Sequence, residues 1–189
     1  MYPARVDPAA LNRGEKSGTM AHQMNDTPFH ADGLRFACTR CSGCCRHEGG
    51  FVFLSEGDLS RLANGFGMDY SAFVDAWCRW VPYTPGRERL SLREKPNLDC
   101  VFWSASAAGS GWCSVYGTRP LQCRAFPFWD IILASRAAWE RAGRECPGIN
   151  SGRLYAMEEI DDFVRRLGEE PVIEREAPGP RPAPRVVEG

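Results

Sequence analysis

Cysteine is the residue that most constrains this chain. All nine cysteines of the 189 residues lie between Cys38 and Cys146. This density approaches that of disulfide-bonded scaffolds, but a domain of this length does not need cross-links merely to fold. The opening residues, MYPARVDPAALNRGEKSGTM, contain no apolar run typical of a signal peptide. We therefore expect a cytoplasmic protein in which the clustered thiols bind a metal rather than form disulfides.

The strongest local signal is the run Cys-Thr-Arg-Cys-Ser-Gly-Cys-Cys at residues 38–45. Two residues between cysteines close a tight turn in which both thiolates can reach one metal, and Gly43 lets the backbone fold close to it. The spacing is typical of the bacterial ferredoxin run, in which a further cysteine precedes a proline. Cys146, which precedes a proline, offers such a residue. The side chain of Cys45 is expected to point away from that of Cys44, toward a second metal or a different face.

Three further cysteines, Cys100, Cys113 and Cys123, follow downstream. Cys123 is expected near the N-terminus of a short helix, which would lower the pKa of its thiol and favour the thiolate that a metal needs. Bound thiolates concentrate negative charge, and the arginines that adjoin cysteines are expected to offset it with N–H donors to sulfur. These arginines are Arg46, Arg119 and Arg124.

In their order and spacing these residues resemble the YkgJ-type cysteine-cluster family, a zinc- or iron-chelating domain. The resemblance covers about residues 36–152 and rests on Cys-x-x-Cys-x-x-Cys-Cys at 38–45 and on Cys100-Val-Phe, Cys113-Ser-Val-Tyr, Arg119-Pro, Cys123-Arg, Phe126-Pro and Cys146-Pro-Gly. It implies eight metal ligands, which are Cys38, Cys41, Cys44, Cys45, Cys100, Cys113, Cys123 and Cys146. His47 is not at a ligand position of the family. Cys78 stands outside the motif and is expected to be a buried structural thiol on a helix.

Two kinds of metal fit this ligand set. Zinc would use two four-thiolate sites, into which eight cysteines divide evenly, whereas the ferredoxin-like spacing favours an iron–sulfur cluster. The first function hypothesis is a metal-binding protein that acts in redox chemistry, cluster handling or partner recognition. An alternative is a metal-dependent protein-modifying enzyme, because the flagellin lysine N-methylases are distantly similar through a comparable cysteine cluster, although the chain shows no recognisable S-adenosylmethionine site. A structural zinc module is the third hypothesis.

Composition excludes some partners. The formal net charge is −1, with basic and acidic residues interspersed, so the chain has no electrostatic attraction for nucleic acid or an anionic membrane. No stretch approaches the roughly 20 apolar residues of a membrane span. The expected partner is therefore the metal ion or cluster, while the sequence leaves a protein partner open and does not identify one.

The pattern of turn and apolar residues predicts a small α+β fold, with short strands and helices around a metal centre. We expect a disordered leader over residues 1–33, a metal-binding domain over 34–167 and a disordered, proline-rich tail over 168–189. Strands are expected at 51–54, 98–103, 112–116 and 128–133. Helices are expected after Ser55, from Asp69 to Trp80, just after Pro120, after Ser135 and over 154–167.

Overall fold

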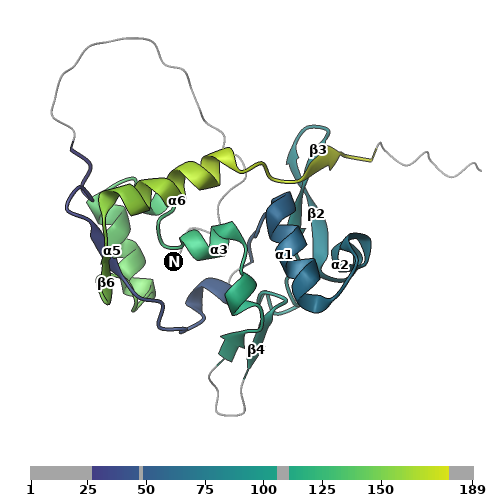
Figure 1. Ribbon diagram of the computed structural model, residues 1–189, viewed down its shortest axis with the longest axis horizontal. Helices are drawn as coiled ribbons and strands as arrows, with labels where there is room; N and C mark the ends of the chain where they lie inside the picture. Colours follow the sequence, from purple (N-terminus) through teal and green to yellow (C-terminus); the bar gives the residue numbers. More distant parts are fainter. Residues whose placement is uncertain (1–26, 47–48, 106–110, 179–189) are drawn as a thin grey trace, which may run out of the picture.

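A computed structural model of the protein describes residues 27–46, 49–105 and 111–178. Short helices alternate with strands that form small antiparallel sheets, which confirms the predicted α+β class. The helices and strands that form two apolar cores lie on opposite sides of the molecule in Figure 1, and the segments that carry most of the cysteines lie between them. The fold is therefore organised around a central region rather than around one large sheet.

The first core lies under two helices and a three-stranded sheet. Helices α1 (Glu56–Phe66) and α2 (Tyr70–Trp77) precede a hairpin of β2 (Cys78–Thr84) and β3 (Arg87–Leu92), and β7 (Glu174–Glu176) pairs with the other edge of β3. These elements bury one apolar cluster, whose members are Val52, Leu54, Leu59, Leu62, Ala63, Phe73, Cys78, Leu90, Leu92, Phe102 and Val115.

The second core lies under the remaining helices. Strand β1 (Leu34–Phe36) pairs with β6 (Arg153–Tyr155), and α4 (Asp130–Leu133), α5 (Arg136–Glu145) and α6 (Met157–Glu169) contribute their apolar sides. Helix α6 runs along the top of Figure 1, from this group toward β7. The buried cluster consists of Leu34, Phe36, Phe126, Phe128, Ile132, Trp139, Ala142, Ile149 and Ile160.

Short elements connect the two cores. They are the 3-10 turns η1 (Gly43–Cys45) and η2 (Tyr116–Thr118), the paired strands β4 (Trp103–Ala105) and β5 (Gly111–Cys113), and helix α3 (Leu121–Ala125). Each of η1, β5 and α3 carries at least one cysteine of the motif. The central region therefore consists of segments that are far apart in sequence.

Several predicted helix boundaries are confirmed. The Ser55 hydroxyl accepts a hydrogen bond from the Asp58 N–H at the start of α1, and Gly67 ends that helix in the left-handed conformation. Pro120 immediately precedes α3, and the Ser135 hydroxyl caps α5 by accepting from the Ala138 N–H. These boundaries were predictable because each depends on residues that are close together in the sequence.

Two element predictions are wrong. The helix expected to continue to Trp80 ends at Trp77, and Cys78 begins strand β2 because residues 78–84 pair with β3. The strand expected at 128–133 is instead α4 and the turn before it, with the Ile132 N–H bonded to the Trp129 carbonyl. A short apolar run does not distinguish a buried strand from a buried helical turn.

The predicted strand at 51–54 is present only as isolated bridges. The Leu54 N–H donates to Leu90 and the Leu92 N–H donates to Val52, so the segment lies beside β3. The strands expected at 98–103 and 112–116 reduce to the short pair β4–β5.

The structured part of the chain continues past the expected boundary at residue 167. Helix α6 ends at Glu169, and β7 adds a strand to the first sheet, so residues 168–176 contribute to the fold rather than to a tail. Most of the expected leader and the end of the expected tail, residues 1–26 and 179–189, lie outside the described residues.

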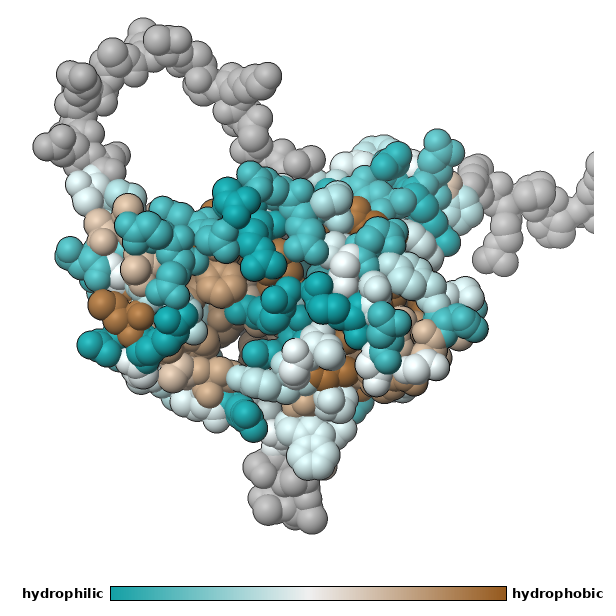
Figure 2. All heavy atoms as spheres, in the orientation of Figure 1, coloured by the Kyte–Doolittle hydropathy of each residue, from teal (hydrophilic) through white to brown (hydrophobic). Residues whose placement is uncertain are grey.

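The surface is mainly hydrophilic on the face shown in Figure 2, where apolar residues appear in separate patches. Among the residues that the structure describes, Trp112 is the most exposed of the large apolar side chains, at 61%. Within the described ranges, no helix is both long enough and apolar enough to cross a membrane.

Candidate metal centre

The Cys-x-x-Cys-x-x-Cys-Cys run forms an exposed loop that ends in η1. Arg40 and Ser42, on either side of Cys41, adopt positive φ angles of 56° and 66°, as a tight turn requires. Cys38, Cys41 and Cys44 are exposed, whereas Cys45 is half-buried. The loop therefore presents three of its four thiols outward, before the chain enters the body of the protein.

Three other cysteines belong to the body. The Cys100 N–H donates to the Cys45 carbonyl at 2.8 Å, which joins the end of the loop to the region before β4. Cys113 lies in β5, where it pairs with Trp103, and Cys123 lies in the middle of α3. All three are half-buried and pack against the first core.

A cavity of about 110 Å³ brings these segments together. Its lining includes six of the eight predicted ligands: Cys38, Cys44, Cys45, Cys100, Cys113 and Cys123. The rest of the lining is mostly apolar or aromatic. Among the described residues that line it, Arg40 and Arg119 carry positive charge and no carboxylate is present. Such a cavity suits a group that soft thiolate ligands bind and that apolar walls protect from water.

Of the two remaining predicted ligands, Cys41 is exposed on the loop and Cys146 lies beside the second core. Cys146 caps the C-terminus of α5 and packs against that core. Two residues later, the Gly148 carbonyl accepts a hydrogen bond from the Ala37 N–H at 3.1 Å. A side chain at Gly148 would lie only 2.2 Å from the Ala37 carbonyl oxygen, so glycine is needed for this close contact. The contact holds the start of the cysteine loop next to Cys146.

Comparison with known protein families shows to which family the chain belongs. Residues 37–147 match the CxxCxxCC family, which is described as a "putative zinc- or iron-chelating domain". The match covers more than half of the chain and includes all nine cysteines. The chain belongs to this family. The resemblance to the YkgJ-type proteins is thus confirmed, and metal binding is the property that the family supports. No solved structure matches the chain.

The cysteines of this CxxCxxCC domain are thiols, since none of the nine forms a disulfide. The sulfurs of Cys44 and Cys45 lie 3.7 Å apart and are hydrogen-bonded to each other, so the expectation that the Cys45 side chain points away from that of Cys44 is wrong. Within the described residues, no three His, Cys, Asp or Glu side chains already stand in an arrangement that could hold a metal ion. The thiols that line the cavity are therefore gathered at one place but not directed at one point, and side-chain movements would have to complete a centre.

Burial and neighbouring thiols raise the pKa of the inner cysteines, which favours their protonated form. Burial raises the pKa of Cys123 well above its usual value, and the nearby Cys100, Cys44 and Cys113 raise it further. The pKa of Cys45 is also raised, mainly by its hydrogen bond with Cys44 and then by burial. The predicted lowering of the Cys123 pKa by the helix N-terminus is wrong, because a five-residue helix cannot offset the burial of this thiol among other thiols.

Two thiols near the edges of the group also have raised pKa values. Burial raises the pKa of both Cys113 and Cys146. Cys100 and Cys44 raise the Cys113 value further, whereas Cys41 and Cys44 raise that of Cys146. A bound cation would reverse this balance by stabilising the thiolates. The donor set therefore fits a thiolate-bound metal.

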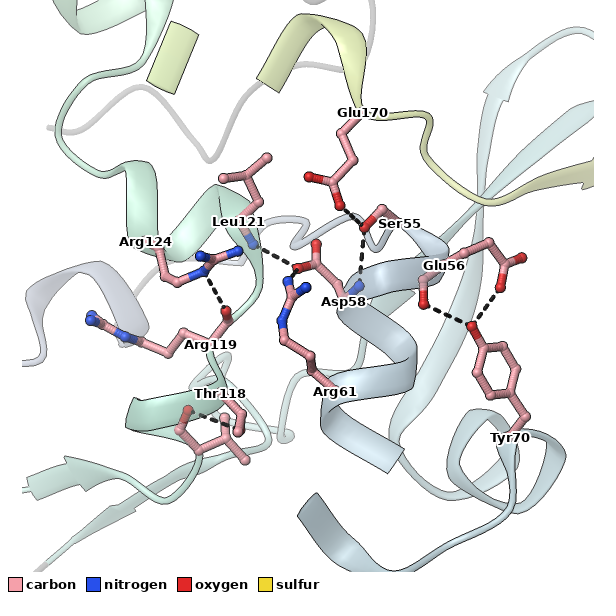
Figure 3. Close-up of polar contacts among 11 residues, drawn as sticks. Ser55, Glu56, Asp58, Arg61, Tyr70, Thr118, Arg119, Leu121, Arg124 and Glu170 are labelled. Carbon is pink, nitrogen blue, oxygen red and sulfur yellow. Dashed lines mark hydrogen bonds and ion pairs between the residues drawn. The ribbon is translucent and has the colours of Figure 1, made fainter. Parts of the chain in front are cut away.

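The three arginines that adjoin cysteines differ in position. The charge of Arg119 opposes the rise in the pKa of Cys113 and Cys123, which is the effect expected of a counter-charge. Arg46 instead lies over the Trp103 ring, at 4.0 Å, and 3.7 Å from the Asp99 carboxylate. Arg124 does not line the cavity, and its Nε donates to the Arg119 carbonyl at 3.0 Å (Figure 3). Arg119 thus supplies the expected counter-charge, although its Nε donates to the Tyr116 carbonyl and not to a sulfur.

Two residues outside the cysteine motif hold the helix that carries Cys123. Figure 3 shows the buried Asp58 carboxylate between α1 and α3, where it accepts a hydrogen bond from the Leu121 N–H at 2.9 Å and pairs with Arg61. Its pKa is raised by burial, an effect that the Leu121 N–H and Arg61 oppose. Asp58 therefore fixes the first turn of α3 from the opposite helix.

Gln122 fixes α3 from its other side. Its amide oxygen accepts from the Phe53 N–H at 3.1 Å, and its amide nitrogen donates to the Phe51 carbonyl at 2.8 Å. The side chain thus takes the place of a strand along residues 51–53. Neither Asp58 nor Gln122 was predicted as part of the site, because only the tertiary structure brings them beside Cys123.

Cys78 and His47 were predicted not to be metal ligands. Cys78 is buried in the first core, as expected of a structural thiol, although it lies on a strand. His47 lies outside the described residues.

Proposed function

We propose that this protein holds an iron–sulfur cluster or zinc through the thiolates of its eight motif cysteines, at the junction of its two cores. The observation that supports this most directly is the convergence of cysteines from the loop, the β4–β5 region and α3 on one mostly apolar cavity. The chemistry that such a group supplies is electron storage for a cluster and structural cross-linking for zinc.

The chain itself contributes ligands, charge and exclusion of water. Arg119 offsets the negative charge of bound thiolates near Cys113 and Cys123. The aromatic rings of Phe102, Phe126 and Trp129 line the cavity and limit access of water and oxidants to it. These features support a centre that works in redox chemistry, cluster handling or partner recognition in the cytoplasm, where the thiols would remain reduced.

An iron–sulfur cluster is the first choice because the loop spacing and the remote Cys146-Pro147 follow a ferredoxin-like pattern. A structural zinc module remains the alternative for a closed four-thiolate site. A metal-dependent protein-modifying enzyme is favoured only by the apolar space beside the thiols, which could admit part of a substrate.

Anaerobic purification followed by analysis of iron, zinc and acid-labile sulfide tests the proposal. We expect iron and sulfide together for a cluster, whereas zinc without sulfide would select the zinc alternative. The Cys78→Ala variant is the control and should keep the metal content of the unaltered chain. Absence of any metal that depends on the motif cysteines would overturn the proposal.

A further inference from the structure

The eight motif cysteines are too many for one four-coordinate centre. We propose that they form two adjacent centres. The inner centre consists of Cys45, Cys100, Cys113 and Cys123, and the outer centre of Cys38, Cys41, Cys44 and Cys146. This inference rests on the proposed metal-binding function and adds to it the division of the ligands.

The inner group is built into the body of the protein. The Cys100 N–H bonds to the Cys45 carbonyl, and the Cys100 carbonyl accepts from the Trp103 N–H at 2.9 Å. Trp103 is in turn the strand partner of Cys113. With Cys123 on α3, these four cysteines all line the cavity, and none of them is exposed.

The outer group gathers around the C-terminus of α5. Phe36 forms an antiparallel bridge with Ile149, and Ala37 bonds to Gly148. Cys38 directly follows Ala37, and Cys146 lies two residues before Gly148, so this hydrogen bond brings the backbone around Cys38 close to that around Cys146. The backbone pairing therefore brings the first cysteine of the loop to the last cysteine of the chain.

Cys41 approaches the same place from the turn of the loop. A side-chain carbon at Gly43 would lie 3.8 Å from the Cys41 sulfur and 3.7 Å from the carbonyl oxygen of Glu145. Because Glu145 precedes Cys146, the Cys41 sulfur and the start of the Cys146 residue flank the same glycine. Cys41 and Cys146 are also the two motif cysteines that do not line the cavity.

The vicinal pair marks the border between the two centres. Cys44 is exposed and completes the Cys-x-x-Cys-x-x-Cys spacing. Cys45 is half-buried, and its backbone carbonyl accepts a hydrogen bond from the Cys100 N–H. Their sulfurs lie 3.7 Å apart, so the two centres would be neighbours. Cys38 and Cys44 line the cavity from the loop side, which is consistent with this adjacency.

Zinc titration of the reduced, metal-free full-length chain tests the division, with bound zinc counted per chain. The unaltered chain is expected to bind two equivalents. A double variant in the outer group, Cys41→Ser with Cys146→Ser, should retain one, and so should the inner double variant, Cys100→Ser with Cys123→Ser. The Cys78→Ser variant is the matched control and should retain both.

The single variant Cys44→Ser decides whether the centres are separate, because we expect it to lose only the outer equivalent. It also keeps the test decisive if the inner double variant fails to fold, since Cys44 is exposed. Loss of both equivalents in Cys44→Ser or in the outer variant would overturn the division while leaving the proposed function intact. A chain that binds neither zinc nor iron would instead refute the proposed function itself.

Discussion

The cysteine loop and the body cysteines differ in what holds them. Cys38, Cys41 and Cys44 are exposed, on a loop with two residues in the left-handed conformation. Cys113 lies on β5, which pairs with β4, and Cys123 lies on α3, whose first turn is hydrogen-bonded to Asp58. Both cysteines pack against the first core. The body half of the site therefore depends on the packing of the fold, whereas the loop half is held mainly by its turns and by contacts at its two ends.

This difference suggests an order of assembly. Thiols that already lie together in the body lose little conformational freedom when a metal binds, whereas ordering an exposed loop costs more. The metal would therefore be held first by the body cysteines and then draw in the loop. Each of the following predictions separates the two regions or measures how strongly the metal joins them.

Metal removal should have the largest effect. Four-thiolate zinc sites contribute roughly 10–16 kcal/mol in zinc-finger peptides, which is as large as the net stability of about 5–15 kcal/mol of a whole domain. We expect chelation under reducing conditions to abolish much of the near-ultraviolet circular dichroism, since Trp112 and Trp129 line the cavity. A metal-free protein with an unchanged spectrum and melting curve would show that the fold is independent of the metal.

Serine substitutions of cysteines in the two regions should lower the free energy of unfolding by different amounts. In the metal-loaded protein, Cys123→Ser should lower the free energy of unfolding by about 2 kcal/mol more than Cys41→Ser does, because a buried hydroxyl without a partner costs about 1–3 kcal/mol. At an exposed position the serine hydroxyl stays hydrated. Urea unfolding measures both variants, and equal losses would mean that the body does not pre-form its half of the site.

Substitution of Asp58 should affect only the half of the site that the body cysteines form. Asp58→Ala leaves the Leu121 N–H without its acceptor, so we expect a loss of about 1–3 kcal/mol in the free energy of unfolding and weaker binding at the centre that includes Cys123. Asp58→Asn keeps an acceptor oxygen and should recover part of both losses. Glu56→Gln, on the same helix but facing Tyr70, is the control. If Asn were as harmful as Ala, the charge and not the hydrogen bond would hold α3.

Cys78 lies outside both regions, and its thiol should react slowly. Burial raises its pKa to about 12 from 9.0, so at any pH below 9 the folded protein has roughly a thousandfold less thiolate there than an unperturbed cysteine has. Because the thiolate is the reactive form, alkylation of Cys78 by iodoacetamide at pH 8 should be correspondingly slow and should accelerate as the pH rises toward 12. Mass spectrometry of the labelled peptides checks this, and rapid labelling would place Cys78 outside the core.

The sequence predicted those parts of the site that depend on local spacing. The cysteine run, the caps at Ser55 and Ser135 and the short helix after Pro120 all follow from neighbouring residues. The family resemblance added the set of eight cysteines. None of these signals could show which cysteines lie together, because Cys45 meets Cys100 only through the tertiary fold.

The parts that the sequence did not predict are contacts between distant segments. Asp58 is an ordinary acidic residue in the first turn of a helix until α3 packs against it. The raised pKa of Cys123 is the opposite of the expected shift, because the burial of that thiol depends on residues throughout the chain. Strand β2 replaced a predicted helix at Cys78 for the same reason, since its pairing with β3 outweighs local preference.

X-ray absorption spectroscopy at the metal edge of the anaerobically purified protein tests the central claim most directly. We predict a first coordination shell of sulfur atoms, at about 2.3 Å if the metal is zinc, with an additional iron–iron distance if the metal is a cluster. The sulfur contribution should fall in Cys100→Ser and Cys123→Ser but not in Cys78→Ser. A shell of oxygen and nitrogen atoms that is unaffected by the motif cysteines would contradict the account.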